Sequence, residues 1–100
     1  MCSSDLGNAV DAALATSAAM AVVAPHLCGM GGDLFALVHV NGQVHALDAA
    51  GRAGFGSSAE QLRSEGHPEM PFHGDIRTVT VPGAVAGWME LHEQIGRAHV

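Results

Sequence analysis

A hairpin with two apolar faces is the feature that most constrains the fold of this 100-residue chain. In the stretch LFALVHVNGQVHALD, an Asn-Gly pair separates two runs of aliphatic residues, which is the strongest short signal for two strands joined by a two-residue turn. The expected pairs are Val40 with Gln43, His39 with Val44, Val38 with His45 and Leu37 with Ala46. Because both faces are mostly apolar, both need cover, and a layered fold is expected rather than a lone hairpin.

An alanine-rich run before the hairpin predicts a helix that ends near Val23. Asn8 can cap its start, Asp11 lies in its first turn, and Pro25 cannot continue it. Alanine occurs on every face of this run and lets neighbouring elements approach closely. We therefore expect this helix to be buried against a sheet.

The glycine cluster GMGGD, residues 29–33, is expected to be a structural turn. Phosphate-binding loops run from a strand into a helix, whose N-terminus faces the anion. Here the glycines follow a predicted helix and precede a predicted strand, and no Lys-Ser or Lys-Thr pair follows them. Gly29, Gly31 and Gly32 can adopt positive φ angles and so turn the chain into the strand at Leu34.

From Ala49 to Arg77 the sequence carries few signals of regular secondary structure, and clearer signals return after Arg77. Within residues 49–77, SSAEQL predicts a short helix, in which Ser57 and Glu60 could form a capping box. IRTVTV, residues 76–81, predicts a strand. PGAVAGWMELHEQIG predicts an amphipathic helix with Pro82 in its first turn and Gly96 just beyond its end. Its expected apolar stripe consists of Ala84, Trp88, Leu91 and Ile95, flanked by Val85 and Met89.

Composition excludes several classes of partner. The formal charge is −6, with four arginines and no lysine, so no basic surface is available for nucleic acid. The apolar run between Asp11 and Pro25 is shorter than the ~20 residues of a membrane span. The two cysteines form no recognisable disulfide framework, and Met1 to Val10 lacks the positive leader of a secretory signal. The cellular compartment therefore stays open.

No metal, cofactor or local nucleophile is expected. Seven histidines are present, but there is no HExxH motif, and the hairpin register places His39 and His45 on opposite faces. Cys28, Ser57 and Ser58 lie in none of the known nucleophile signatures. Cys28 is expected to be a small buried hydrophobe, and His26 a hydrogen-bonded interior or loop group.

Arg52 is the candidate for ligand binding. The segment LDAAGRAG places it just past a strand end, where loops commonly carry function, and a guanidinium can hold a carboxylate through two hydrogen bonds. The alternative is a solvated or salt-bridged loop arginine.

Four collinear segments carry a family resemblance: GNAVDAALA, PHLCGMGGDLFALV, ALDAAGRA and VPGAVAGWMELHEQIGR. Together they resemble the N-terminal part of the large subunit of gamma-glutamyltranspeptidases, over Gly7 to Arg97. The resemblance implies an α/β (α+β) chain that is a fragment of the four-layer αββα sandwich of N-terminal nucleophile hydrolases. It also implies a self-cleaving precursor whose catalytic threonine lies beyond this chain. None of Thr16, Thr78 or Thr80 matches that threonine.

The resemblance departs from the family pattern at the substrate arginine. The family's arginine, which binds the α-carboxylate of the glutamyl group, aligns with Ala50, and Arg52 comes two residues later in a GRA arrangement similar to that of a divergent branch. Two explanations remain open. Either the loop bulges so that Arg52 takes over the role, or the protein acts on a different acyl group.

The resemblance implies that the whole protein is a gamma-glutamyltransferase or glutathione hydrolase and that this chain alone is inactive. Its expected partners are a small γ-glutamyl substrate and the remainder of its own precursor. The alternatives are a related acylase acting on a non-glutamyl acyl amide, and a small non-enzymatic binding module. Residues 7–97 are expected to be a partial large-subunit domain, with non-native or truncated ends at 1–6 and 98–100. Alone, the chain is expected to be marginally folded.

Overall fold

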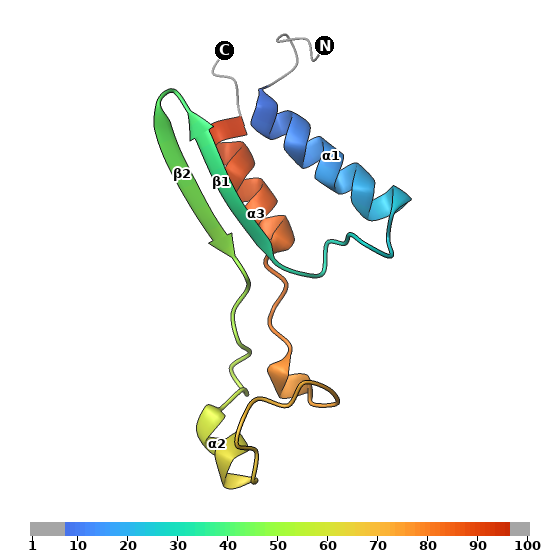
Figure 1. Ribbon diagram of the computed structural model, residues 1–100, viewed down its shortest axis with the longest axis vertical. Coiled ribbons are helices and arrows are strands. Elements are labelled where there is room, and N and C mark those ends of the chain that lie inside the picture. The colour runs from blue at the N-terminus through green and yellow to red at the C-terminus, as the bar shows by residue number, and fades with distance from the viewer. Residues whose placement is uncertain (1–7, 97–100) are drawn as a thin grey trace.

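The computed structural model describes residues 8–96, so the expected non-native ends lie outside the described residues. The order of elements is helix α1 (Ala9–Val23), strands β1 (Leu34–Val40) and β2 (Gln43–Ala49), helix α2 (Ala59–Ser64), a 3-10 turn η1 (Ile76–Thr78), helix α3 (Ala84–Leu91) and a π-helical turn η2 (His92–Gly96). Figure 1 shows α3 running along the hairpin, while α2 lies at the far end of the molecule.

The hairpin forms with the predicted register. The strands pair antiparallel, Val40 with Gln43 and Val38 with His45 among the seven pairs, and the turn residues Asn41 and Gly42 have φ angles of 51° and 75°. Positive φ at both turn positions matches the right-handed twist of the strands. Local turn chemistry therefore determined the register, as the sequence predicted.

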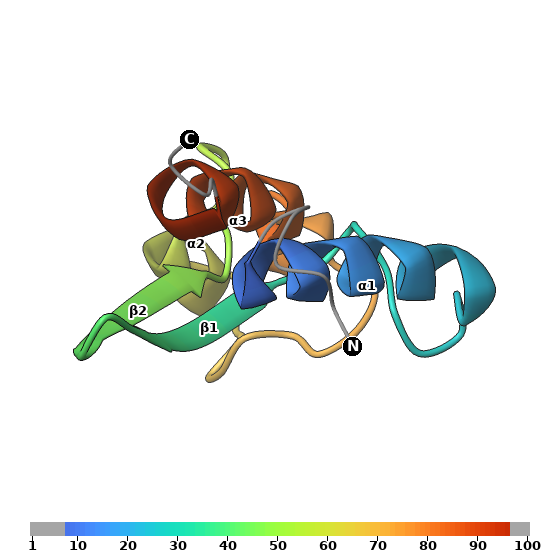
Figure 2. The ribbon, with the colours of Figure 1, turned by 90° about the horizontal axis from the view of Figure 1, so that it is seen from above.

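Within residues 8–96, one face of the hairpin is covered and the other is not. Helix α3 packs against both strands, and from above α1 lies beside β1 and α3 (Figure 2). On the uncovered face, Phe35, Leu37 and Val44 have exposed fractions of 65%, 80% and 70%. The residues described here thus supply one covering layer, although the sheet carries apolar side chains on both faces.

Helix α3 carries most of the core. Ala84 and Leu91 of its predicted stripe are buried, but Val85 and Met89 are exposed rather than flanking the core. Gly87, which was not predicted to be part of the core, is also buried, and a Cβ there would lie 2.6 Å from Leu34 Cδ2 and 2.8 Å from the Ala49 Cβ.

The predicted ends of this last helix need correction. It begins at Ala84, with Gly83 as N-cap, and not at Pro82. After Leu91 the chain continues as the π-helical turn η2, so Gly96 lies within that turn and not beyond it. Gly96 is buried, and a Cβ there would collide with the carboxylate of Asp11.

Helix α1 has the predicted bounds but not the predicted burial. The Asn8 side chain accepts hydrogen bonds from the backbone N–H groups of Val10 (3.0 Å) and Asp11 (3.1 Å), as expected of a cap. No residue of α1 is buried. The start of α1 contacts η2 through two side chains. Asn8 Nδ2 donates to the Ile95 carbonyl at 2.6 Å, and Asp11 Oδ1 lies 2.9 Å from His92 Nδ1. Small alanine side chains give the rest of the helix little contact area.

The segment between the hairpin and α3, residues 54–78, forms a lobe of its own, and two predictions fail there. Residues 76–81 are not a strand, because Asp75 accepts from Arg77 N (2.9 Å) and Thr78 Oγ1 donates back to the Asp75 carbonyl (2.8 Å), which closes the turn η1. Only Thr80 forms a bridge, with Ala53. The cap of α2 is Ser58, whose hydroxyl accepts from Gln61 N, so the predicted box of Ser57 and Glu60 is wrong.

The molecule is extended for its length. Its radius of gyration is 17.6 Å, compared with about 13 Å for a compact 100-residue domain. Within the part of the chain that the structure describes, the buried hydrophobic residues are Leu62, Ala84 and Leu91. No helix within residues 8–96 is long and apolar enough to cross a bilayer.

Candidate functional site

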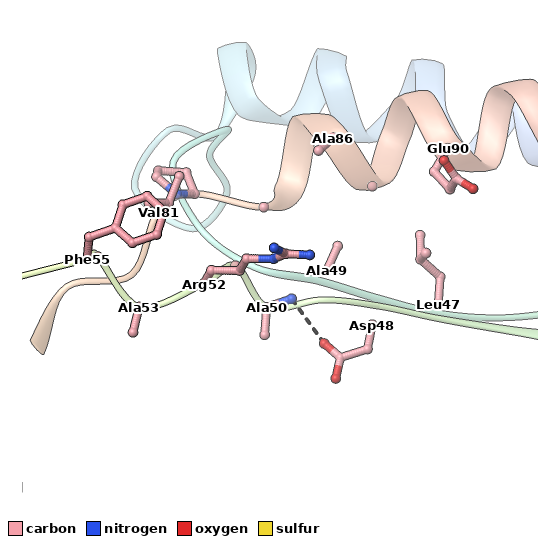
Figure 3. A pocket seen from close by; sticks show the side chains of 15 residues that line it. Leu47, Asp48, Ala49, Ala50, Arg52, Ala53, Phe55, Val81, Ala86 and Glu90 are labelled. Carbon is pink, nitrogen blue, oxygen red and sulfur yellow. Dashed lines mark hydrogen bonds between the residues drawn. The ribbon is translucent and has the colours of Figure 1, made fainter. Parts of the chain in front are cut away.

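The candidate site is a hollow of about 850 Å³ around Arg52. One wall is the end of β2 with the loop that follows it, residues 47–55. The opposite wall consists of residues 81–83 and one side of α3. Figure 3 shows Arg52 between these two walls, with Phe55 at one end of the hollow and Glu90 on α3.

Two glycines allow the walls to approach closely. Gly51 has a φ of +84°, and a Cβ on it would overlap the Val81 carbonyl oxygen. A Cβ on Gly83 would overlap the Ala49 carbonyl oxygen in the same way. Any side chain at either position would therefore push the Arg52 loop away from the start of α3.

Backbone contacts then hold Arg52 in place. The N–H of Val81 donates to the Arg52 carbonyl at 2.8 Å, and the next residue, Ala53, bridges to Thr80. The Thr80 hydroxyl also lies 3.5 Å from the Ala50 carbonyl. The loop that carries the candidate arginine is thus fastened to the segment that leads into α3.

Arg52 and Ala50 lie on opposite sides of this loop. In Figure 3 the Arg52 side chain lies on the side of α3, whereas Ala50 points away from the helix together with Asp48. The Asp48 carboxylate accepts a hydrogen bond from the Ala50 N–H at 3.0 Å. A left-handed glycine between positions 50 and 52 breaks the regular alternation of side chains. Both residues line the hollow, but only the side chain of Arg52 lies on the side of α3.

The hollow combines one cation with mostly small and apolar walls. Arg52 is exposed and forms no ion pair within residues 8–96. Glu90, on the other wall, accepts a hydrogen bond from Gln94 Nε2. An arginine that forms no ion pair within residues 8–96, beside mostly small and apolar walls, can bind the carboxylate of a small ligand through two hydrogen bonds.

The glycine cluster is a turn, as expected, but the positive φ angles predicted for Gly29, Gly31 and Gly32 are wrong, because the positive-φ glycines of residues 8–96 are Gly42, Gly51, Gly66 and Gly74. The turn also has a second role. Its Gly32 carbonyl accepts from the N–H groups of Gly83 (3.2 Å) and Ala84 (2.9 Å). Because Gly83 offers no side chain as a cap, this carbonyl satisfies donors at the start of α3. No local pattern predicts this contact, because it joins segments about fifty residues apart.

The other candidate residues remain apart from Arg52. His39 is exposed and His45 half-buried on the opposite face of the hairpin. His26 lies exposed in a turn, and Cys28 is half-buried rather than buried as expected. Among the described residues, no three potential metal ligands come together.

A second cluster of charged residues, centred on Arg77 in the lobe, was not predicted from the sequence. Arg77 forms ion pairs with Asp75 (2.6 Å) and Glu65 (2.7 Å). Hydrogen bonds from the Arg77 side chain and backbone lower the pKa of Asp75 to about 2, and the Arg77 side chain also lowers the pKa of Glu65. The short spacing of Asp75 and Arg77 is the signal that could have indicated this ion pair, but it lies at the start of the segment predicted to be a strand.

Comparison with known proteins gives the same family for nearly the whole chain. The family model for gamma-glutamyltranspeptidase matches residues 4–100. The chain is 42% identical over 85 residues to the oxamate amidohydrolase proenzyme of Klebsiella pneumoniae, covering 84% of this chain and 16% of that protein. It is 38% identical to the glutathione hydrolase-like YwrD proenzyme of Bacillus subtilis, covering 91% of this chain and 17% of the relative.

Solved structures that resemble this chain belong to the same family. The gamma-glutamyltranspeptidase of Helicobacter pylori superposes with a TM-score of 0.76 at 35% identity, over 91% of this chain and 27% of that one. The enzyme from Pseudomonas nitroreducens gives 0.69 at 29% identity, over 91% and 28%. The chain spans about a sixth of the length of the two curated relatives. It belongs to the gamma-glutamyltranspeptidase family, as an α+β piece of the N-terminal nucleophile hydrolase fold.

Proposed function

We propose that the complete protein cleaves γ-glutamyl amides and passes the glutamyl group to water or to an amino acid. The observation that carries this proposal is Arg52, whose guanidinium lies in the hollow between β2 and α3 without an ion pair among the described residues. In this proposal Arg52 holds the α-carboxylate of the glutamyl group. The threonine nucleophile would come from the part of the precursor outside this chain.

The proposed role of Arg52 is binding and orientation. The threonine would attack the γ-amide carbonyl, release the amine and form an acyl-enzyme, which water or an amino acid would then resolve. A bidentate contact at the α-carboxylate, remote from the reacting amide, fixes the position of that carbonyl relative to the nucleophile. Because this contact is present in the bound substrate as well as in the transition state, its loss should raise KM more than it lowers kcat.

A second candidate is an acylase that takes a shorter donor, the monoamide of a small dicarboxylic acid. Two observations favour it: the arginine stands at position 52 and not at Ala50, and a relative at 42% identity is named as an oxamate amidohydrolase. Such a donor also presents a carboxylate to an arginine, but it is shorter than a glutamyl group and lacks its ammonium.

Two substrates distinguish these candidates. The full-length precursor is expressed, allowed to cleave itself, and assayed with a chromogenic γ-glutamyl anilide and, separately, for ammonia release from oxamate. We expect a higher kcat/KM for the γ-glutamyl donor. Preference for oxamate would move the assignment to the second candidate, and turnover of neither would contradict both. The matched control is the same precursor with its junction threonine replaced by alanine.

A further inference from the structure

The lobe of residues 54–78 is organised around the side chain of Arg77. Its Nη1 and Nη2 donate to the two carboxylate oxygens of Glu65 at 3.0 and 2.7 Å. Its Nε donates to Asp75 Oδ1 at 2.9 Å, and Nη2 donates to Oδ2 of the same residue at 2.6 Å. All three guanidinium nitrogens are therefore engaged with two carboxylates, a geometry that a single lysine ammonium cannot reproduce.

The backbone of Arg77 also contacts a third segment of the lobe, at Ser57. Its carbonyl accepts a hydrogen bond from Ser57 Oγ at 2.7 Å. Glu65 is the C-cap of α2, and Asp75 is the N-cap of η1. The beginning of the lobe, its middle and its end thus meet at one residue.

The same lobe connects the two walls of the Arg52 hollow. It leaves the Arg52 loop after Ala53 and returns at Thr80, and these two residues form the bridge described above. Figure 1 shows the two connecting segments running next to each other between the hairpin and the lobe. Thr80 comes three residues after Arg77, so the Arg77 contacts lie close in sequence to the segment that pairs with the Arg52 loop.

We propose that Arg77 is a positioning residue for Arg52, an inference that rests on the proposed function. The ion pairs with Glu65 and Asp75 keep the lobe compact, so that its two ends remain close and paired. Without them the bridge between Ala53 and Thr80 would have to close a longer flexible loop, which costs more conformational entropy. The hydrogen bond from Val81 to the Arg52 carbonyl would open more often, and the guanidinium would be less well placed for a carboxylate.

The test is a double-mutant cycle in the full-length, self-processed enzyme with a γ-glutamyl anilide. Arg77→Met removes the ion pairs and keeps the aliphatic stem. We expect it to raise KM about threefold to tenfold with kcat nearly unchanged, a size typical of coupling within one contact network. Arg77→Lys should restore only part of the loss. Arg63→Met, in the same lobe, is the matched control and should leave KM unchanged, because Arg63 forms no ion pair within residues 8–96.

The decisive arm uses the Arg52→Ala background. If Arg77 acts through Arg52, Arg77→Met should raise KM no further once Arg52 is gone. An equal rise in both backgrounds, or no rise in either, would overturn the inference. If Arg52→Ala alone leaves the kinetics unchanged, the assigned role of Arg52 fails first and the inference fails with it.

A milder variant keeps the test informative if Arg77→Met yields no processed enzyme. Glu65→Gln removes one of the two ion pairs and should raise KM in the same direction by a smaller factor. Failure of both variants to process would assign Arg77 to folding of the precursor and would overturn the positioning role.

Discussion

Replacing Gly51 with alanine tests how closely the two walls of the Arg52 hollow approach. Gly51 has a φ of +84°, and a Cβ there would overlap the Val81 carbonyl oxygen. A left-handed conformation costs a non-glycine residue about 1–2 kcal/mol. Forcing an extra methyl group into a closed contact costs about 1–3 kcal/mol more. We therefore expect Gly51→Ala to destabilise the protein by about 2–5 kcal/mol.

Gly74 provides the matched control, because its φ is +81° and a Cβ there would meet nothing within 4 Å. Gly74→Ala should show the conformational cost alone, about 1–2 kcal/mol. Urea unfolding of the full-length protein measures both losses, and the difference between them isolates the contact with Val81. Gly51→Ala should also raise KM for a carboxylate-bearing donor, since the Arg52 loop must shift. Equal stability losses in the two variants, with KM unchanged, would refute the close approach of the two walls.

Three further predictions concern the isolated chain and the lobe. The purified 100-residue chain should not turn over a γ-glutamyl anilide, and reproducible activity after removal of contaminating enzymes would contradict its assignment as a non-catalytic piece. The same chain should bind a hydrophobic dye and melt without a sharp transition, because Phe35, Leu37 and Val44 are exposed; a cooperative melt at micromolar concentration would show a self-sufficient domain. In the full-length protein, folding lowers the pKa of Asp75 from 3.8 to about 2, so the unfolded chain binds more protons in that interval. The stability contributed by Asp75 is therefore present above pH 3.8 and lost as the pH falls through 2. Asp75→Asn should flatten this part of an acid unfolding profile, and an unchanged profile would contradict the ion pair.

Features encoded by neighbouring residues were predictable from the sequence. The Asn41-Gly42 turn set the hairpin register, and Asn8 set the start of α1, because both depend on contacts within a few positions. The prediction of a strand over 76–81 is wrong. The hydrogen bonds around Asp75 are also local, but they favour a turn over an extended chain.

Features that depend on distant segments were not predictable. The burial expected of α1 requires cover that residues 8–96 do not provide. The need for glycine at 83 and 87 arises from contacts with Ala49 and Leu34, more than thirty residues away. Arg52 was identified as a candidate from its place after a strand, but the hollow around it exists only because α3 returns to that loop.

The most direct test of the assigned role of Arg52 is the kinetics of Arg52→Ala in the full-length, processed enzyme. Loss of a charged, bidentate contact is worth about 1.5–3 kcal/mol, so kcat/KM for a γ-glutamyl donor should fall about tenfold to a hundredfold, mainly through KM. Arg52→Lys should recover only part of this loss, because an ammonium lacks the planar fork of the guanidinium. Arg63→Ala should behave as the wild type. Unchanged kinetics in both Arg52 variants would show that Arg52 is an ordinary loop arginine and would contradict the proposed substrate contact.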